Sequence, residues 1–589
     1  MIAFVLTYHI GTSQITIDSV FIVDSAHQIF KHTKPAYKYQ NELNQGTSTF
    51  LSSIASAQIQ QSSPGGLATL LHRGMGSRHL PVMWEGVNIQ SMVNGSFDLS
   101  LIPLQLYSGT KFYTFGAPTL TGSNSLAGAM DITDFKEYQK SHVGFHLSTL
   151  SNLDMMTKLV HTGKKYSGSF GGELSFHQNR YSYIANNIRE NRVGTNQNKY
   201  NLIHKSNYYI SKNQMLGIDI WHQGSDREIP VSTSSAYISQ QQIDQNTRIK
   251  SYHTILIGDI KFNSWFAWMD ENIHFKTPSV DSKANVSVIN AGTEFNNQSG
   301  YAIKLTYRKD IVDANFFNGI KSRTQLSVAS SKTFEIKKST ISVSARQDFT
   351  DGTWMPFSFT GSINHKKLSV QLSRNFNLPG FNDLYWPVSG RDDLKTELSH
   401  QGELKYNFNV LGLKILTLMY GNHVKDWIQW IPVSNGLWTP SNQKTVLSRG
   451  FESRLSKEWN HAEINVKAEL QYHFNHTTAL DHYFENDLIG KQLIYVPQHT
   501  LTSGFLIGKN HQTISGSLRF TGKRYYTPDN QYHLSPYYTV DIYYRYKLWD
   551  KAELNISIQN LTNHQYNIVR FFPMPGITGS FSFKYYIKS

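Results

Sequence analysis

A strict alternation of apolar and polar residues, over segments of roughly ten residues, is the feature that most limits how this chain folds. It is clearest at residues 463–474, where every second side chain is apolar and those between are polar or charged. Successive side chains of a β-strand point to opposite faces, so this pattern predicts a strand with one apolar face and one polar face. The apolar positions are Ile464, Val466, Ala468, Leu470, Tyr472 and Phe474.

Similar segments recur from about Ser141 to the C-terminus, for example at residues 538–548, 553–559 and 581–587. Their length of about ten residues matches a tilted strand that crosses a bilayer and exceeds the usual length of strands in soluble sheets. Tyrosines near the segment ends suit an aromatic girdle at the membrane interface. The pattern favours an all-β transmembrane barrel. A soluble β-sandwich, solenoid or propeller is the alternative, although no repeat of solenoid or propeller period is apparent.

The composition agrees with strands rather than membrane helices. Aromatic residues make up 13% of the chain and charged residues 17%, and no apolar stretch reaches the roughly 18 residues of a membrane helix. A barrel of about twenty strands encloses a lumen that its own side chains cannot fill, so a separate domain has to occupy it. The first hundred-odd residues, with glycine-rich turns, short apolar strands and a candidate helix at 49–57, are the predicted occupant. Residues 116–135 then lead into the first barrel strand.

The sequence also excludes several kinds of chemistry. Cysteine is absent, which rules out disulfides, thiolate metal sites and cysteine nucleophiles. No phosphate-binding GxxxxGK[ST] loop, GxSxG elbow or HExxH zinc pair occurs, so the chain is not expected to be an enzyme. The formal net charge is +14, but the basic residues are scattered singly, so nucleic-acid binding is not expected. His72 and His79 flank one turn, yet no carboxylate or cysteine cluster lies near them in sequence, so no metal site is predicted.

Residues 64–103 (PGGLATLLHRGMGSRHLPVMWEGVNIQSMVNGSFDLSLIP) resemble a known family. The pair Arg73-Gly74, the apolar strand and turn at 81–87, and the Asp-Leu-Ser sequence at 98–100 match the plug domain of TonB-dependent receptors. Residues 122–132 resemble the glycine-rich end of the same plug, where bare backbone packs tightly. This resemblance implies a barrel of about 22 antiparallel strands with a small α+β plug domain inside its lumen.

The resemblance continues through the barrel. Residues 373–397 resemble a mid-barrel strand and loop of the family, and residues 427–452 (WIQWIP…RGFE) resemble its Bacteroidetes-type members. Residues 495–499 (YVPQH) resemble a common periplasmic turn, and residues 560–576 resemble the end of the barrel. The C-terminus departs from the pattern, because family members usually finish on an aromatic residue read by the assembly machinery, whereas this chain ends in Ile-Lys-Ser.

The resemblance divides the chain into four parts. Residues 1–17 are interpreted as a remnant of a signal peptide or an N-terminal extension; the alternative is that the apolar run at 1–10 is a simple strand. Residues 18–23 resemble a TonB box, an extended segment that adds to a sheet edge of a periplasmic energy transducer; the alternative is a first plug strand. Residues 24–135 are the expected plug, and residues 136–589 are the expected barrel. The TonB box candidates are Asp18, Ser19, Val20, Phe21, Ile22 and Val23.

Five residues form the predicted core motif of the plug: Arg73, Gly74, Arg78, Glu85 and Gly86. The two arginines and the glutamate are candidates for charge pairing with the barrel wall, where polar links can break more readily than an apolar core. The alternative is that Arg73 and Glu85 merely hold the plug's own fold.

Three residues of the 87–97 turn, Met92, Asn94 and Phe97, are candidate contacts for a ligand. The resemblance implies this role, because the apices of the plug contact the ligand in this family. The alternative is that they are ordinary loop residues.

The resemblance implies active import across the outer membrane of a Gram-negative cell, powered by a TonB-type energy transducer in the periplasm. Cobalamin or another corrinoid is the first expectation for the small-molecule ligand, because the overall pattern resembles the cobalamin-receptor branch; an iron siderophore or haem is the second. No resident cofactor is expected, although the cargo can itself contain cobalt or iron. Outer-membrane lipids are expected partners, and a surface lipoprotein is considered as another. A passive channel without energy coupling is the alternative class.

Overall fold

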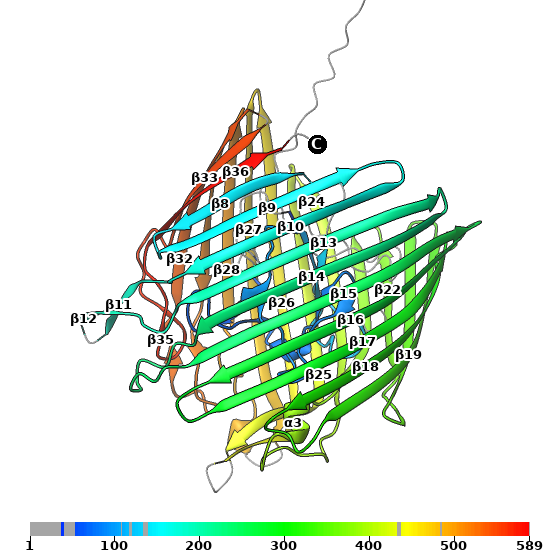
Figure 1. Cartoon of the computed structure of the whole chain (residues 1–589), viewed down its shortest axis with the longest axis horizontal. Helices are drawn as coiled ribbons and strands as arrows, with labels where there is room; N and C mark the ends of the chain where they lie inside the picture. The colour runs from blue at the N-terminus through cyan, green and yellow to red at the C-terminus, as the bar shows by residue number, and fades with distance from the viewer. Residues whose placement is uncertain are drawn as a thin grey trace, which may run out of the picture.

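The computed structural model describes residues 37–40, 54–107, 109–116, 121–133, 140–185, 187–432, 437–482, 486–549 and 551–587. These residues form a closed antiparallel β-barrel with a smaller domain inside it (Figure 1). The two-residue strand β21 lies beside β20, which also pairs directly with β22, so the wall has twenty-two full strands. The predicted all-β barrel and its strand number are confirmed.

The barrel is an up-and-down meander, because each strand pairs with the next barrel strand along the chain. The ring closes where the last strand pairs with the first, from Ser580↔Ser148 to Tyr586↔His142. The barrel strands are β8 (His142–Ser148), β9 (Asn152–Thr162), β10 (Tyr166–His177), β13 (Gln197–Ser211), β14 (Gln214–Glu228), β15 (Gln241–Ile257), β16 (Ile260–Lys276), β17 (Asp281–Asn297), β18 (Tyr301–Ala314), β19 (Lys321–Ile336), β20 (Ser339–Thr350), β21 (Thr353–Trp354), β22 (Ser358–His365), β23 (Leu368–Asn377), β24 (Glu397–Val410), β25 (Leu413–Pro432), β26 (Trp438–His461), β27 (Ile464–His482), β28 (His499–Lys509), β29 (Gln512–Thr521), β32 (Tyr537–Leu548), β33 (Ala552–Gln559) and β36 (Thr578–Tyr586).

The alternation seen in the sequence separates a polar lumen from an apolar outer surface. In β27, Leu470 on the outer face is 38% exposed, whereas Gln471 on the inner face is 5% exposed. In β32, Tyr538 is 42% exposed on the outer face, and Tyr543, the one aromatic residue predicted on the polar side, is 8% exposed. The exposed apolar face is the one that meets lipid. Among the described residues, no helix is long and apolar enough to cross a membrane.

The two ends of the barrel differ in their connections. Hairpins at one end are tight, as at residues 212–213, whereas the connections at the other end include residues 378–396, which carry the short helix α3 (Phe381–Tyr385). Outer-membrane barrels have short periplasmic turns and longer outer loops, so the end with α3 faces outward. Figure 1 shows the C-terminus at the opposite, periplasmic end.

The prediction that residues 495–499 form a periplasmic turn is wrong. They complete the outer connection between β27 and β28, which also contains the 3-10 turn η4 (Asn486–Leu488). The tight periplasmic hairpin at this side of the sheet is formed instead by residues 510–511, between β28 and β29. A proline such as Pro497 fits a long connection, because it cannot donate a hydrogen bond to the sheet.

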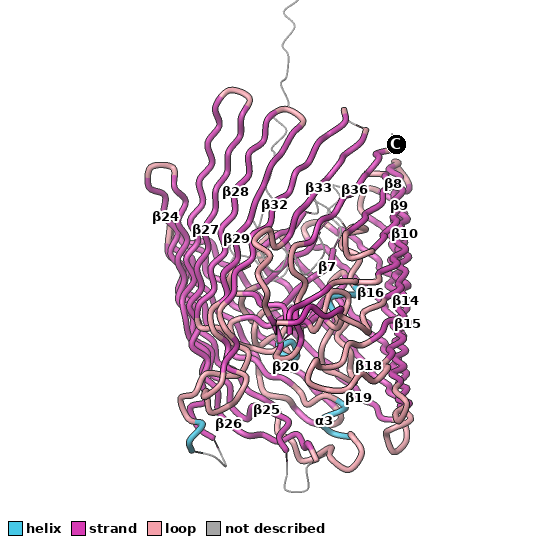
Figure 2. Tube along the Cα trace, turned by 90° about the vertical axis from the view of Figure 1, so that its left-hand side faces the viewer, coloured by secondary structure: helices cyan, strands magenta, loops and turns pink. Residues whose placement is uncertain are grey.

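The inner domain, which we call the plug, consists of a five-stranded sheet of order β1-β6-β7-β4-β5 and the hairpin β2-β3. Figure 2 shows β7 inside the ring of strands. Of the candidate helix at 49–57, residues 54–56 form a turn and Ala57 begins β2, so these residues are not helical. The plug elements are β1 (Tyr37–Gln40), β2 (Ala57–Gln61), β3 (Ala68–His72), η1 (Ser77–His79), β4 (Val82–Trp84), β5 (Val87–Asn88), η2 (Leu99–Leu101), β6 (Gly109–Tyr113) and β7 (Ala129–Thr133).

The outer loops contain three small hairpins, which do not belong to the wall. The last of them folds over the barrel mouth, where Tyr181 donates a hydrogen bond to the Pro573 carbonyl at 2.8 Å. Their strands are β11 (Ser182–Ala185), β12 (Ile188–Asn191), β30 (Arg524–Tyr525), β31 (His533–Leu534), β34 (Asn567–Val569) and β35 (Phe572–Pro573).

The apolar core of the plug continues into the barrel wall. Trp84 of β4 and Trp221 of β14 are both fully buried, with ring centroids 6.3 Å apart. The indole of Trp84 also donates a hydrogen bond of 2.8 Å to the Tyr107 hydroxyl. Packing of this kind is direction-dependent and close, so the plug has one defined orientation in the lumen.

Candidate functional site at the plug–barrel interface

The Arg73-Gly74 pair forms the tight turn that follows β3. Arg73 and Gly74 both have positive φ angles, 51° and 77°, and His72 and Met75 on either side exchange backbone hydrogen bonds of 3.1 and 2.9 Å. Such a two-residue turn favours glycine at its second position. Glycine is also required by the wall, because a Cβ at position 74 would overlap the hydroxyl of Thr477 on β27. The turn therefore presses the plug backbone directly against the barrel.

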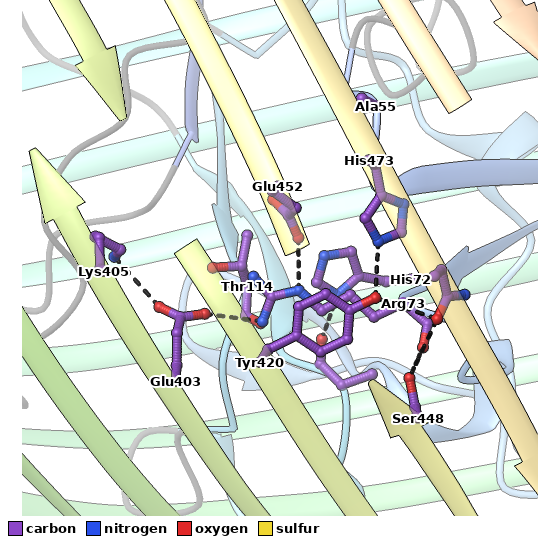
Figure 3. Close-up of polar contacts among 12 residues, drawn as sticks. Ala55, His72, Arg73, Thr114, Glu403, Lys405, Tyr420, Ser448, Glu452 and His473 are labelled. Atoms are coloured by element: carbon purple, nitrogen blue, oxygen red, sulfur yellow. Dashed lines mark hydrogen bonds and ion pairs between the residues drawn. The ribbon is translucent and has the colours of Figure 1, made fainter. Parts of the chain in front are cut away.

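The guanidinium of Arg73 crosses from the plug to two carboxylates on the barrel wall (Figure 3). Its Nη1 lies 2.8 Å from Glu403 of β24, and its Nε lies 2.7 Å from Glu452 of β26. Nη1 also donates to the Thr114 carbonyl at 3.0 Å, and the group lies 4.4 Å from the centroid of the Tyr420 ring. Burial alone would lower the pKa of Arg73, but the two carboxylates raise it above its ordinary value, so the side chain stays charged.

Arg73 of the plug and Lys405 of the wall together balance the charges of Glu403 and Glu452. Lys405 lies 3.4 Å from the second oxygen of Glu403, so two cations face two carboxylates. The Tyr420 hydroxyl forms a 2.8 Å hydrogen bond with His473, and the Ser448 hydroxyl donates to the Arg73 carbonyl. Buried ion pairs contribute little net stability, but removal of one partner is strongly unfavourable, so this cluster fixes the position of the plug.

A second pair of contacts joins the plug to the outer loop and to β24. Arg78 forms an ion pair with Asp383 of α3, and His79 lies 2.9 Å from Glu397. Burial tends to lower the pKa of Arg78, and the charge of Asp383 raises it above its usual value. Arg78 thus links the plug to the connection that covers its outer side.

Glu85 and Gly86 form the turn between β4 and β5, again with two positive φ angles, 48° and 79°. The Glu85 carboxylate forms an ion pair with Lys205 of β13, and its carbonyl accepts a 2.5 Å hydrogen bond from Lys250 of β15. The Glu85 carboxylate also accepts a hydrogen bond of 3.2 Å from the Thr133 hydroxyl within the plug. Arg73, Arg78 and Glu85 are therefore all paired with barrel residues.

Asp98 forms a further contact between plug and wall. It is part of the plug motif identified in the sequence, although the sequence does not predict its role. It caps η2 by accepting from the backbone of Ser100 at 3.0 Å, and Arg227 of β14 approaches its other oxygen at 2.5 Å. Arg227 also donates to the Ser100 hydroxyl at 3.1 Å. The Asp-Leu-Ser sequence at 98–100 draws attention to Asp98. Its partner Arg227 is 129 residues away in the sequence, so the pair itself could not be predicted.

Amide side chains of the wall bind the plug backbone near its glycine-rich end. Gln401 accepts a 3.0 Å hydrogen bond from the Gly116 nitrogen and donates to the Leu126 carbonyl, which also accepts from Asn422 at 2.8 Å. Asn375 donates to the Ser125 carbonyl at 2.7 Å. None of these wall residues carries a sequence signal, because isolated polar residues occur on every inner strand face.

The three predicted ligand contacts lie at different depths. The Met92 carbonyl accepts a 3.2 Å hydrogen bond from the Phe381 nitrogen, and the exposed Asn94 lies 3.3 Å from the side-chain nitrogen of Asn382, so α3 meets the plug apex here. Phe97 is 7% exposed and belongs to the hydrophobic core. Only the first two lie directly beneath the outer loop.

Two further predictions concern the TonB box candidates and a metal site at the plug histidines. The TonB box candidates at 18–23 lie outside the described residues. His72 forms a 2.7 Å hydrogen bond with the Ala127 carbonyl, and within the part of the chain that the structure describes no group of three or more His, Asp or Glu side chains is placed to hold a metal ion.

The fold and this interface define a class of protein: the chain belongs to the TonB-dependent receptors, which import nutrients through the outer membrane. The family description "TonB dependent receptor-like, beta-barrel" matches residues 89–561, and "TonB-dependent Receptor Plug Domain" matches residues 35–129. The family consists of receptors and transporters rather than enzymes, and its members work with TonB and a small-molecule ligand.

Several proteins of known function are similar to this chain at low sequence identity. The vitamin B12 transporter BtuB of Photobacterium profundum is 22% identical over 535 residues, covering 87% of this chain and 85% of the relative. Among solved structures, the FrpB iron transporter from Neisseria meningitidis superposes with a TM-score of 0.78 at 11% identity, covering 93% of this chain and 98% of the other. The siderophore receptor PirA from Acinetobacter baumannii gives 0.76 at 13% identity, covering 93% and 97%. The structural likenesses show the fold alone.

Proposed function

We propose that this receptor imports cobalamin or a related corrinoid. The observation that carries the proposal is the similarity to vitamin B12 transporters, which spans plug and barrel together and covers 87% of the chain. A second such transporter, from Vibrio vulnificus, is also 22% identical and covers 69% of this chain. Cobalt would then belong to the cargo, and the protein itself would need no resident cofactor.

Energy coupling is proposed to act through residues 18–23. An extended segment with free backbone groups can add to the sheet edge of a periplasmic partner, so main-chain hydrogen bonds transmit a pull with little demand on side chains. Such a pull would reach a plug that is bound to the wall by polar groups such as Arg73 and Glu85. This arrangement supports a gate that needs outside energy and disfavours a passive channel, because the lumen is occupied. A surface lipoprotein partner stays a prediction of the family resemblance.

The test separates binding from transport. A Gram-negative host without its own cobalamin receptor would express the full chain or a variant lacking residues 18–23, and labelled cyanocobalamin would be measured on cells and inside them. The full chain is expected to bind and import the label, whereas the deletion variant is expected to bind it without import. Import by the deletion variant would contradict energy coupling through this segment.

Competition then tests the choice of ligand. Unlabelled cyanocobalamin and cobinamide are expected to displace the label, whereas ferric siderophores and haem in the same excess are not. If the cells take up ferric siderophore or haem and do not bind cyanocobalamin, the corrinoid assignment is wrong and the iron-receptor alternative replaces it.

A further inference from the structure

The polar contacts between plug and wall are unevenly distributed around the ring. We call strands β13 to β26 the anchoring wall, because they supply charged partners that form ion pairs with the plug. On the remaining arc, Arg519 of β29 and Lys158 of β9 donate hydrogen bonds to backbone carbonyls of the plug. The remaining arc contains the strand pair that closes the barrel, and we call β28, β29, β32, β33, β36 and β8–β10 the seam wall, with β27 between the two. The charged contacts of the anchoring wall are Lys205, Arg227, Lys250, Arg308, Glu397, Glu403 and Glu452.

Two cavities lie between the plug and the seam wall. The larger has a volume of about 470 Å³ and is bounded by the β2–β3 hairpin, the inner faces of β28, β29 and β32, and the outer loop at 560–577. The smaller, of about 250 Å³, reaches deeper, to His146 of β8 and Asn555 near the periplasmic start of β33. The two cavities adjoin, because they share lining residues on both the plug and the wall. These are Ile102, Leu150, Asn152, His177, Lys199, Tyr543, Gln559 and Thr578.

The space follows from the size of the side chains on the seam wall. Several residues that line it carry short hydroxyl side chains, namely Ser515, Ser517, Thr539, Ser557 and Ser580. On the anchoring wall, longer side chains such as Gln401 and Glu403 reach the plug and bind it. Serine and threonine cannot span the same distance, so a gap remains, and both polar and apolar groups line it.

A stacked aromatic pair and a few hydrogen bonds lie at the ends of the space. At the outer end, Tyr566 of the 560–577 loop stacks on Tyr537 at 4.4 Å, and Arg524 donates a 3.0 Å hydrogen bond to the Asn567 carbonyl. Toward the periplasm, Lys158 of β9 donates a 2.5 Å hydrogen bond to the Leu106 carbonyl of the plug. Contacts of this kind can open locally at lower cost than a buried core.

We propose that the imported molecule passes between the plug and the seam wall, while the plug remains bound to the anchoring wall. Passage on the seam side extends a space that already exists. Passage on the opposite side would separate the Arg73, Glu85 and Asp98 ion pairs and leave several buried charges without partners. The inference rests on the proposed import function, but it does not depend on which molecule is carried.

Single cysteines can test the two walls separately, because the chain contains no cysteine of its own. Ser515→Cys, Thr539→Cys and Ser557→Cys place one thiol on the seam side. Ser342→Cys and Ser373→Cys place one thiol at buried inner positions of β20 and β23 on the anchoring wall and serve as matched controls. Each substitution is close in size to the original side chain, and the folded barrel can be verified by its heat-modifiable migration.

Cells that express each full-length variant are treated with a membrane-impermeant biotin maleimide, with the proton motive force intact or dissipated, and with or without cyanocobalamin. The three seam thiols are expected to label several-fold faster in energised cells, and the two control thiols are expected to stay unlabelled. After labelling, the seam variants should still bind cyanocobalamin but lose its uptake.

The labelling pattern and the uptake of cobalamin are scored independently. Equal labelling of both walls, labelling of the anchoring wall alone, or normal uptake through a labelled seam wall would overturn the proposal. The parent protein could fail to import cyanocobalamin while the seam thiols are still labelled selectively in energised cells. That result would contradict cobalamin as the imported molecule but would support passage along the seam wall.

Discussion

The plug meets the two walls of its barrel through different chemistry. Toward the anchoring wall, buried guanidinium and carboxylate groups are paired at fixed distances, as Arg73 is with Glu403 and Glu452. Toward the seam wall, small hydroxyl side chains face a space of several hundred cubic ångströms that is lined by both polar and apolar groups. A plug can thus be held in one orientation without being packed equally tightly against all sides of the barrel. Changes on the anchoring wall should therefore affect stability far more than changes on the seam wall.

The largest effect is expected from Arg73→Ala. The substitution leaves the carboxylates of Glu403 and Glu452 buried with only Lys405 to balance them, and loss of one partner from a buried ion pair typically costs about 3–5 kcal/mol. Thermal unfolding of the purified receptor should show the loss, and cells should become permeable to large antibiotics. Arg391→Ala is the matched control, because Arg391 pairs with Asp393 at an exposed site and such pairs contribute little. If the two variants were equally stable, the buried ion pairs of Arg73 would contribute no more to stability than the exposed pair of Arg391.

A smaller effect is expected from Gly74→Ala. The added methyl group meets Thr477 on the wall, and the positive φ of the site disfavours any side chain, which together cost about 2–4 kcal/mol. Gly86→Ala has a similar φ but nothing within 4 Å of the new methyl group, so it should cost only about 1–2 kcal/mol. Unfolding measurements on both variants isolate the contribution of wall contact; a larger loss for Gly86→Ala would contradict it.

The plug core should also be sensitive to acid. Burial, together with the nearby Arg73 charge, holds the pKa of His72 well below its usual value of 6.5. The unfolded chain then takes up a proton that the folded plug does not, so this contribution to stability is complete above about pH 6.5 and declines by about 1.4 kcal/mol per unit as the pH falls. In unfolding measured from pH 7.5 to 5, His72→Gln should reduce the slope of the parent by up to about 1.4 kcal/mol per pH unit. The exposed turn variant His511→Gln should keep the slope of the parent.

The smallest effect is expected on the seam wall. Thr539→Ala removes a hydroxyl that faces the cavity, and its free energy of unfolding should change by less than about 0.5 kcal/mol. Gln401→Ala on the anchoring wall removes hydrogen bonds to the Gly116 and Leu126 backbones and should cost about 1–3 kcal/mol. An equal loss of stability in both variants would show that the two walls contribute equally to holding the plug.

The barrel could be predicted from the sequence because its physics is local. Each strand needs an apolar face toward lipid and a polar face toward the lumen, so period-two patterns such as residues 464–474 carry the information residue by residue. The plug motif at 64–103 could be identified by its resemblance to a family. The segment at 495–499 shows the limit of such short matches, because its turn-like residues fit an outer connection as well as a periplasmic hairpin.

The partners of the plug motif could not be predicted in this way. Arg73 is separated by 330 residues from Glu403 and by 379 from Glu452, and one charged residue on a lumen-facing strand looks like any other. The position of α3 over Met92 and Asn94 is likewise a product of the closed ring. Pairings of this kind arise only when the whole barrel has formed, so a single sequence contains no local trace of them.

The pairing of β36 with β8 has a consequence for biogenesis. These strands are the last and the first of the wall, and Thr149 and Gly579 at their junction are 430 residues apart in sequence. The cylinder cannot be closed until β36 has been synthesised, and contacts between such distant parts of a chain form slowly. The described plug strands precede every wall strand in the sequence, so the plug has been synthesised before the two edges of the wall can pair. Topology thus sets an order for biogenesis: the inner domain is made before the ring is closed.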